Sequence, residues 1–170
     1  MSFIKLSHRS LVSLLMVFVL FGLLTSKTFA EEDDGDLIKV VYHADFADPR
    51  RFSAMLTSIN NMATFYENEL IEYDIRIVFV AHGIRFVTDD KLMGTPFQEN
   101  AAMAERRENI KGRLVSLNEV MSVKLELCDI TRSGINLAED KLYEAVDFVP
   151  SGVVRIAELQ RRGFSYLKVE

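Results

Sequence analysis

Between residues 37 and 169, short β-branched runs alternate with longer helical stretches, and this alternation constrains the fold more than any other feature of the chain. The first run, Leu37 to His43, is almost continuously apolar, as expected of a strand covered on both faces of a sheet. Asp48 and Pro49 then supply a helix N-cap and a first helical residue, and apolar residues recur at helical spacing from Phe52 to Leu70. This segment predicts a strand followed by an amphipathic helix of roughly five turns.

The same pattern recurs along the chain. We expect further strands at residues 75–81, 123–128, 146–149 and 164–169, and helices at 103–121 and after Ser151. Strands and helices that alternate at these lengths predict an α/β domain whose five strands form a mainly parallel sheet with right-handed crossovers. The charged stretch from Glu105 to Arg113 is expected to be a solvated, ion-paired face of its helix.

The N-terminus has the pattern of an export signal. Lys5 and Arg9 precede an uncharged, mostly apolar run over residues 11–24, and Thr28 and Ala30 place small residues at the −3 and −1 positions of a cleavage site. The run is shorter than the ~18 residues of a membrane-spanning helix. We expect cleavage after Ala30, with an uncleaved N-terminal anchor as the alternative.

This reading divides the chain into a signal peptide at residues 1–30, a flexible acidic leader at 31–36 and one α/β domain at 37–170. The product would be periplasmic or secreted. Cleavage removes three of the 20 basic residues and none of the 25 acidic ones, which leaves 17 basic against 25 acidic residues. The acidic balance argues against nucleic acid as a partner. No second apolar stretch has the length of a membrane span, so we expect no membrane association after cleavage.

The predicted strand ends gather the chemically active residues on one edge. In a parallel α/β sheet, ligands bind outside the carboxyl ends of the strands. Two histidines of the mature chain and its single cysteine fall there. The candidate residues are His43, His82, Gly83, Cys128, Asp129, Thr131, Arg132, Ser151 and Gly152.

Cys128 poses the main functional question. In an oxidising compartment a lone thiol has no intramolecular partner, so that Cys128 is reactive, buried and inert, or paired with another chain. A reactive thiol needs groups that favour the thiolate. Thr131 and Ser133 are candidate caps of a short following helix, Arg132 brings positive charge and His82 is a candidate helper across the strands, whereas Asp129 works in the opposite direction.

Other kinds of site have less support. His43, His82, Cys128 and Asp129 are residue types that bind transition metals, but their spacings match no metal motif. Ser151 and Gly152 begin a helix whose free N–H groups suit an anion, or form an ordinary cap. The sequence lacks the glycine-rich nucleotide-binding motifs and the serine-hydrolase motif, and we expect no cofactor.

The order of these features resembles the DsrE/DsrF-like sulfur-relay family. The resemblance covers Ile38 to Val169. It rests on the strand ending in Val80-Ala81-His82-Gly83, the strand ending in Leu127-Cys128 and the C-terminal run from Val149 to Gln160 that closes with Gly163 to Lys168. The sulfur-relay members work in the cytoplasm, whereas this chain carries an export signal.

The resemblance implies a three-layer α/β fold, assembly into homotrimers or homohexamers, and a cysteine that carries persulfide sulfur and aligns with Cys128. The implied partner is a sulfur donor or acceptor, either a protein or a small sulfur compound. Our first hypothesis is therefore an exported sulfur carrier or sulfurtransferase. The second is a non-catalytic oligomeric binding module in which Cys128 is structural.

Overall fold

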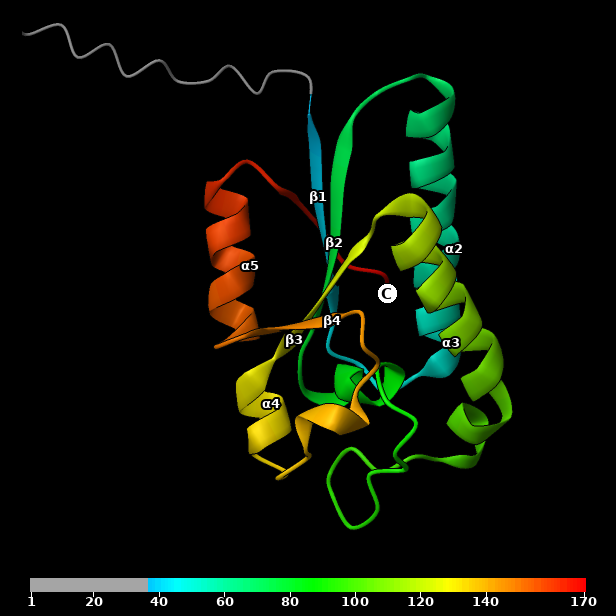
Figure 1. Ribbon diagram of the computed structural model, residues 1–170, viewed down its shortest axis with the longest axis vertical. Coiled ribbons are helices and arrows are strands. Elements are labelled where there is room, and N and C mark those ends of the chain that lie inside the picture. Colours follow the sequence, from blue (N-terminus) through cyan, green and yellow to red (C-terminus); the bar gives the residue numbers. More distant parts are fainter. Residues whose placement is uncertain (1–36) are drawn as a thin grey trace, which may run out of the picture. The chain divides into compact units, whose positions relative to one another are not determined.

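The computed structural model describes residues 37–170, which form one sheet covered by helices on both faces (Figure 1). The predicted signal peptide and acidic leader lie outside the described residues. The elements follow in this order: β1 (Ile38–Ala44), α2 (Pro49–Asn68), β2 (Tyr73–Phe79), the 3₁₀ helix η1 (Ala81–Phe86), α3 (Ala101–Met121), β3 (Lys124–Cys128), α4 (Asp129–Ser133), the 3₁₀ helix η2 (Glu139–Lys141), β4 (Val146–Val149), α5 (Gly152–Arg161) and β5 (Ser165–Leu167).

The sheet has five strands in the order β4-β3-β2-β1-β5, and every neighbouring pair is parallel. Helices α2 and α3 lie side by side on one face, while α4 and α5 lie on the other side (Figure 1). The predicted α/β class, the five-stranded parallel sheet and the three layers are therefore confirmed. The carboxyl ends of the strands point to the bottom of Figure 1.

The two faces of the sheet bury cores of different size. The larger core lies between the sheet and helices α2 and α3, where Phe52 and Phe86 stack with their ring centroids 4.0 Å apart. The smaller core, under α5, consists of Val41, Val78, Ile156, Leu159 and Phe164. The thinner layer on the α5 side leaves room on that face of the sheet for polar and charged side chains.

The start of α2 follows the sequence pattern directly. Pro49 occupies the first turn, and the carboxylate of Asp48 accepts a hydrogen bond of 2.7 Å from the backbone N–H of Arg50. The side chain thereby satisfies an N–H group that has no partner within the helix.

Some details differ from the sequence prediction, among them the final strand, which is confined to Ser165–Leu167. The second strand ends at Phe79 rather than residue 81, because Ala81 takes the left-handed region with φ 49° and the chain turns into η1. Arg107 is buried rather than solvated, and its guanidinium binds Glu99 at 3.0 Å and the backbone carbonyl of Arg85. This buried arginine holds the irregular segment before α3 against η1. No helix within residues 37–170 is both long and apolar enough to cross a membrane.

Candidate functional site

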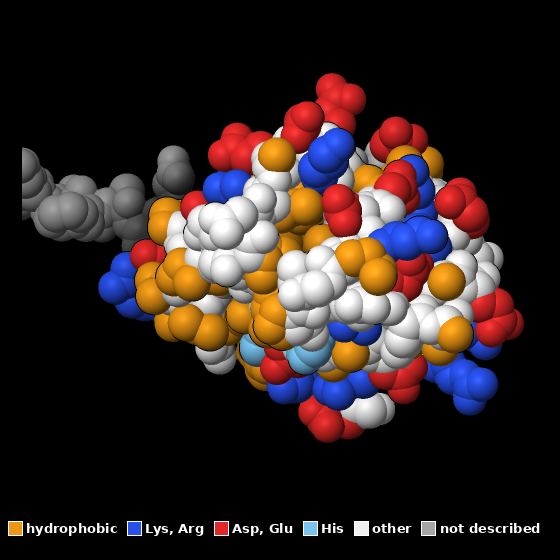
Figure 2. Space-filling model, turned by 90° about the horizontal axis from the view of Figure 1, so that it is seen from below, with side chains coloured by type: hydrophobic (Ala, Val, Ile, Leu, Met, Phe, Trp, Pro, Cys, Tyr) orange, Lys and Arg blue, Asp and Glu red, His pale blue; other side chains and the backbone are white. Residues whose placement is uncertain are grey.

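The candidate site lies at the carboxyl edge of the sheet, the face that Figure 2 presents. Histidine side chains reach the surface there among acidic and basic side chains and beside a hydrophobic area. Helix α5 begins at this edge with Gly152. Ser151 is its N-cap residue, but the Ser151 side chain makes no capping hydrogen bond. The first-turn N–H groups of α5 therefore lack the side-chain acceptor that a cap commonly supplies.

Cys128 is the last residue of β3 and pairs with Val149 of β4. It is 5% exposed and forms no disulfide. Gly152 packs against it so closely that a Cβ at Gly152 would lie 3.0 Å from Cys128 Cβ and 2.5 Å from Val80 Cγ2. The cysteine is thus enclosed between the sheet and the beginning of α5.

The residues that follow Cys128 form the short helix α4 and are engaged with one another. Arg132 Nε donates to Asp129 Oδ1 at 2.7 Å, and Arg132 Nη1 donates to the carbonyl of Leu137. The positive charge predicted to favour the thiolate and the negative charge predicted to oppose it therefore pair with each other. The guanidinium also lies over the ring of Phe148, 5.5 Å from its centroid.

Thr131 and Ser133 do not cap α4, contrary to the prediction, because both lie inside the helix and Cys128 is its N-cap residue. Thr131 Oγ1 accepts a hydrogen bond of 3.0 Å from the backbone N–H of Ala81, which ties α4 to η1. Ser133 Oγ donates to the carbonyl of Asp129.

His82 lies in η1 and contacts two residues on the side of the larger core. Its Nδ1 is 3.2 Å from Arg85 Nη2, and its ring meets that of Phe97 edge to face at 5.3 Å. Burial, with the nearby charge of Arg85, lowers the pKa of His82 below its ordinary value. The imidazole is therefore neutral at physiological pH.

Gly83 follows His82 where η1 crosses the end of β1. A Cβ at Gly83 would lie only 2.0 Å from the carbonyl oxygen of Ala44, so the position requires the absence of a side chain. Gly83 thus allows the backbone of η1 to pack directly against the end of β1.

His43, near the end of β1, lies on the α5 face of the sheet. Its Nδ1 is 3.0 Å from the hydroxyl of Tyr166, whereas its Nε2 is buried without a hydrogen-bond partner, 3.9 Å from Asp45. Burial lowers the pKa of His43, an effect that the carboxylate of Asp45 opposes and the ammonium of Lys168 reinforces.

His43 also lines a hollow of 330 Å³ beside α5. The other lining residues are Val153, Ile156, Gln160 and Tyr166. Apolar walls with a few polar groups are typical of small-molecule pockets, although this one is at the small end of their usual size. Sequence reasoning did not single out Tyr166 and Gln160 as site residues: both lie in the C-terminal run that carries the resemblance, but they enter the site only through the packing of β5 and α5.

The strand register relates His43 to Cys128. His43 pairs with Val78, and Val78 pairs with Glu126, two residues before Cys128. Since strands lie ~4.8 Å apart and side chains alternate between faces, His43 and Cys128 share one face with Cα atoms roughly 12 Å apart. Gly152 contacts Val78, Val80 and Cys128 in this interval. The thiol and the imidazole therefore flank the first turn of α5.

A buried ionic network continues along the same face. The Glu126 carboxylate accepts hydrogen bonds from Arg155 at 2.7 Å and from Arg76 at 2.8 Å, and Arg76 also binds Asp74. Burial opposes ionisation, but the hydrogen bonds from Arg155 and Arg76 outweigh it and lower the pKa of Glu126. The network fixes α5 to β2 and β3, and so positions the N-terminus of α5 beside Cys128.

Metal ligands do not gather within residues 37–170: no three side chains of His, Cys, Asp or Glu lie close enough together to hold an ion. His43 and His82 each contact groups other than Cys128. The structure thus brings Cys128, Gly152 and Val80 together, with Ser151 adjacent, and places His43 across the first turn of α5 from the thiol.

Comparisons with known proteins agree with this architecture. The chain is similar to a protein of unknown function, MTH1491 from Methanobacterium thermoautotrophicum, with 23% identity and a TM-score of 0.60 over 77% of this chain and 98% of that one. It is also similar to the ychN protein from E. coli, with 20% identity and a TM-score of 0.51 over the same shares of the two chains. At these identities the likeness shows the fold alone.

No curated protein matches this sequence. The model of the DsrE/DsrF-like family matches residues 37–169, which is nearly all of the described domain. With its all-parallel sheet and its cysteine at the end of β3, the chain belongs to the DsrE/DsrF-like family.

Proposed function

We propose that this protein handles sulfane sulfur and carries it as a persulfide on Cys128. The observation that supports the proposal best is the position of Cys128 at the carboxyl edge of the sheet, against Gly152 at the N-terminus of α5. The family membership adds to it, since the fold is that of sulfur-relay proteins.

The chemistry requires only the thiolate and a donor. The sulfur of Cys128 attacks the terminal sulfur of a persulfide or polysulfide, a new S–S bond forms on Cys128, and the S–S bond of the donor breaks to release its thiolate. An acceptor thiolate reverses these steps. The first-turn N–H groups of α5 point out of the N-terminus of the helix, which is the positive end of the helix dipole. They therefore stabilise the anionic persulfide.

Access to the thiol requires local movement, because Cys128 is almost completely covered. Gly152 covers the thiol, so access requires a displacement of the start of α5 from the end of β3 when a partner docks. The partner would be a sulfur donor or acceptor, either a protein or a small sulfur compound.

The burial of Cys128 also favours a second candidate function. In this alternative, the cysteine packs as a small apolar residue, and the protein is a non-catalytic binding module. The hollow between His43 and α5 would then hold the ligand.

We further propose that the protein is exported after cleavage at Ala30 and assembles into a homotrimer or homohexamer. Exposed apolar side chains on the elements beside β3 support assembly, among them Val153 at 61% and Val154 at 53% exposure in α5. The pattern of residues 1–30 supports export.

Intact mass spectrometry of natively folded protein tests the two functions. After brief incubation with polysulfide, a carrier gains about 32 Da, the mass of one sulfur atom, and loses it on reduction. Cys128→Ser serves as the control and should gain nothing. If the folded protein gains no sulfur and the thiol reacts only after denaturation, Cys128 is structural and the binding module is favoured.

A further inference from the structure

Helix α5 contacts strand β3 at two neighbouring points on one face of the sheet. At the end of the strand, Gly152 packs against Cys128. One turn further along α5, Arg155 forms an ion pair with Glu126, which precedes Cys128 by two residues and lies on the same face. The contact that covers the thiol therefore lies next to an ionic contact between the same two elements.

The ion pair is the stronger of the two contacts. Arg155 Nε donates to Glu126 Oε2 at 2.7 Å and Arg155 Nη2 donates to Glu126 Oε1 at 2.7 Å, so the pair is bidentate. Glu126 is only 4% exposed, and solvent ions screen a buried pair weakly. Gly152, by contrast, has no side chain and buries little apolar surface. Arg155 therefore supplies most of the attachment between the first turn of α5 and β3.

The rest of this first turn is loosely held. Val153 and Val154 are 61% and 53% exposed, and the side chain of the N-cap residue Ser151 makes no capping hydrogen bond. Helix ends without such a cap open readily. The next buried residues, Ile156 and Leu159, belong to the smaller core and hold the remainder of α5 on the sheet. An opening motion can thus be confined to residues 152–155.

Release of Arg155 does not leave a buried charge without a partner. Glu126 Oε1 also accepts a hydrogen bond of 2.8 Å from Arg76 Nη1, and this second ion pair lies within the sheet. The side chain of Arg155 is 18% exposed, so its guanidinium is already near solvent. Because both charges keep a favourable environment, the first turn of α5 can separate from β3 without the cost of an unpaired buried ion.

We propose that Arg155 is a positioning residue that controls access to Cys128: when its ion pair with Glu126 breaks, the first turn of α5 leaves β3 and the thiol becomes accessible. The importance of this control for sulfur transfer rests on the proposed function of Cys128. The motion itself does not, since any reagent that modifies the thiol must wait for the same opening.

The rate at which iodoacetamide, a small neutral reagent, alkylates Cys128 in the folded protein tests the proposal. Arg155→Met should raise this rate roughly tenfold to hundredfold, the usual effect of losing a hydrogen bond to a charged group. Loss of a nearby positive charge would by itself disfavour the thiolate and slow the reaction. The rate in Arg155→Met should also be insensitive to low urea concentrations, because a local opening exposes little surface. Arg155→Lys, which keeps the charge without the bidentate geometry, should react at an intermediate rate.

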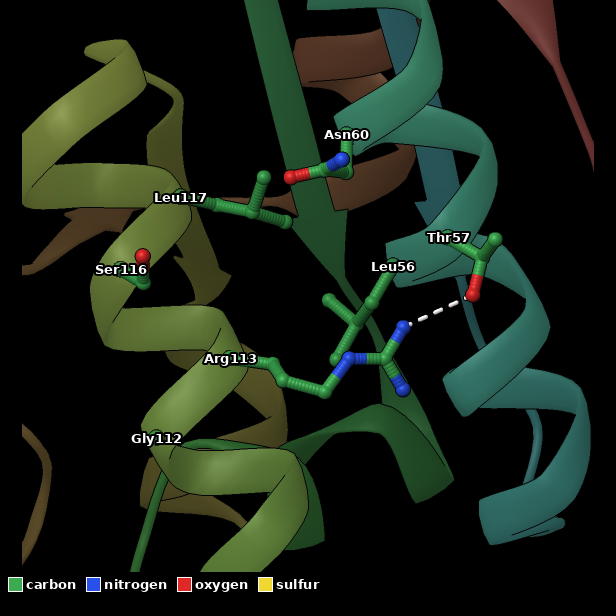
Figure 3. Close-up of a pocket in the computed structure, with 7 residues that line it drawn as sticks. All are labelled: Leu56, Thr57, Asn60, Gly112, Arg113, Ser116 and Leu117. Atoms are coloured by element: carbon green, nitrogen blue, oxygen red, sulfur yellow. Dashed lines mark hydrogen bonds between the residues drawn. The ribbon is translucent and has the colours of Figure 1, made fainter.

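Arg113→Met is the matched control. Arg113 also joins two elements, but it lies on the opposite face of the sheet, where it extends from α3 to α2 (Figures 1 and 3). Its guanidinium donates to Ser53 Oγ at 2.6 Å, to the Ser53 carbonyl at 3.0 Å and to Thr57 Oγ1 at 2.8 Å. This variant should lower the urea midpoint and leave the alkylation rate of Cys128 unchanged.

Three results would overturn the proposal: an unchanged rate in Arg155→Met, an equal acceleration in Arg113→Met, or an acceleration that grows with urea as steeply as global unfolding. The sulfur chemistry is tested separately, by the rate at which polysulfide adds one sulfur atom to Arg155→Met. If iodoacetamide reacts faster with this variant and polysulfide never adds sulfur, the control of access stands and the carrier function fails.

Discussion

Gly152 and Cys128 are in direct contact: a Cβ on the glycine would lie 3.0 Å from Cβ of the cysteine. This contact joins the first residue of α5 to the last residue of β3, and makes Gly152 part of the wall around the thiol. The identity of residue 152 therefore affects the packing of the thiol and the position of α5 together.

We predict that Gly152→Ala destabilises the protein by ~1–3 kcal/mol, the usual cost of adding a methyl group to a packed site. The methyl would also lie 2.5 Å from Val80 Cγ2, so the side chain of Val80 or the start of α5 must shift. Urea unfolding measures the loss. The rate at which a thiol reagent modifies Cys128 in the folded protein should change at the same time, and an unchanged rate and midpoint would contradict the contact.

Gly83→Ala should cost more, about 3 kcal/mol or above. The added Cβ would lie 2.0 Å from the carbonyl oxygen of Ala44, a backbone atom that also accepts the N–H of Val80 at 2.9 Å. Relief of the clash would break that hydrogen bond at the end of the sheet. Thermal or urea unfolding checks the prediction.

Gly112→Ala is the matched control for Gly83→Ala. Its Cβ would meet nothing within 4 Å in the middle of α3, so a gain of ~0.5–1 kcal/mol is expected from helix propensity alone. Similar effects of the two substitutions would show that close packing at Gly83 does not matter.

The sequence predicted the fold well because the spacing of apolar residues within each segment determines whether that segment forms a strand or a helix. The run from Leu37 to His43 predicted β1 within one residue, and the capping pair Asp48 and Pro49 predicted the start of α2, whose end at Asn68 lies two residues before the predicted Leu70. The early end of β2 was missed, because it depends on the left-handed conformation of Ala81, a residue that normally avoids it.

The candidate site was predictable only in part. The topology rule located the edge where His43, Cys128 and Gly152 occur. It could not show that His82 turns toward Arg85 and Phe97, because the direction of a side chain in η1 depends on tertiary packing. The sequence also did not predict the ion pair between Arg132 and Asp129, since this interaction forms only once α4 is present.

Glu126 gives a prediction on acid stability. Its pKa is lowered from 4.5, so its contribution to the free energy of unfolding is complete above this value and is lost as the pH falls through the lower pKa of the folded state. Glu126→Gln should cost about 3 kcal/mol near neutral pH, because it leaves Arg76 and Arg155 without their shared carboxylate. The loss should shrink in acid. Urea unfolding of both proteins across the acid range tests this, and a pH-independent difference would refute it.

His43 should make the free energy of unfolding depend on pH in the range between the pKa of its folded state and the ordinary value of 6.5. In this window the unfolded chain binds a proton that the folded imidazole rejects, so stability declines as the pH falls from 6.5 and levels off below the folded pKa. An NMR titration of the His43 ring should therefore give a midpoint below 6.5. Because the carboxylate of Asp45 favours the protonated ring, Asp45→Asn should lower the midpoint further, while Lys168→Met, which removes an opposing charge, should raise it. A midpoint at or above 6.5 in the parent protein would mean that solvent reaches the imidazole, and that the unpartnered Nε2 is hydrated rather than buried against the sheet.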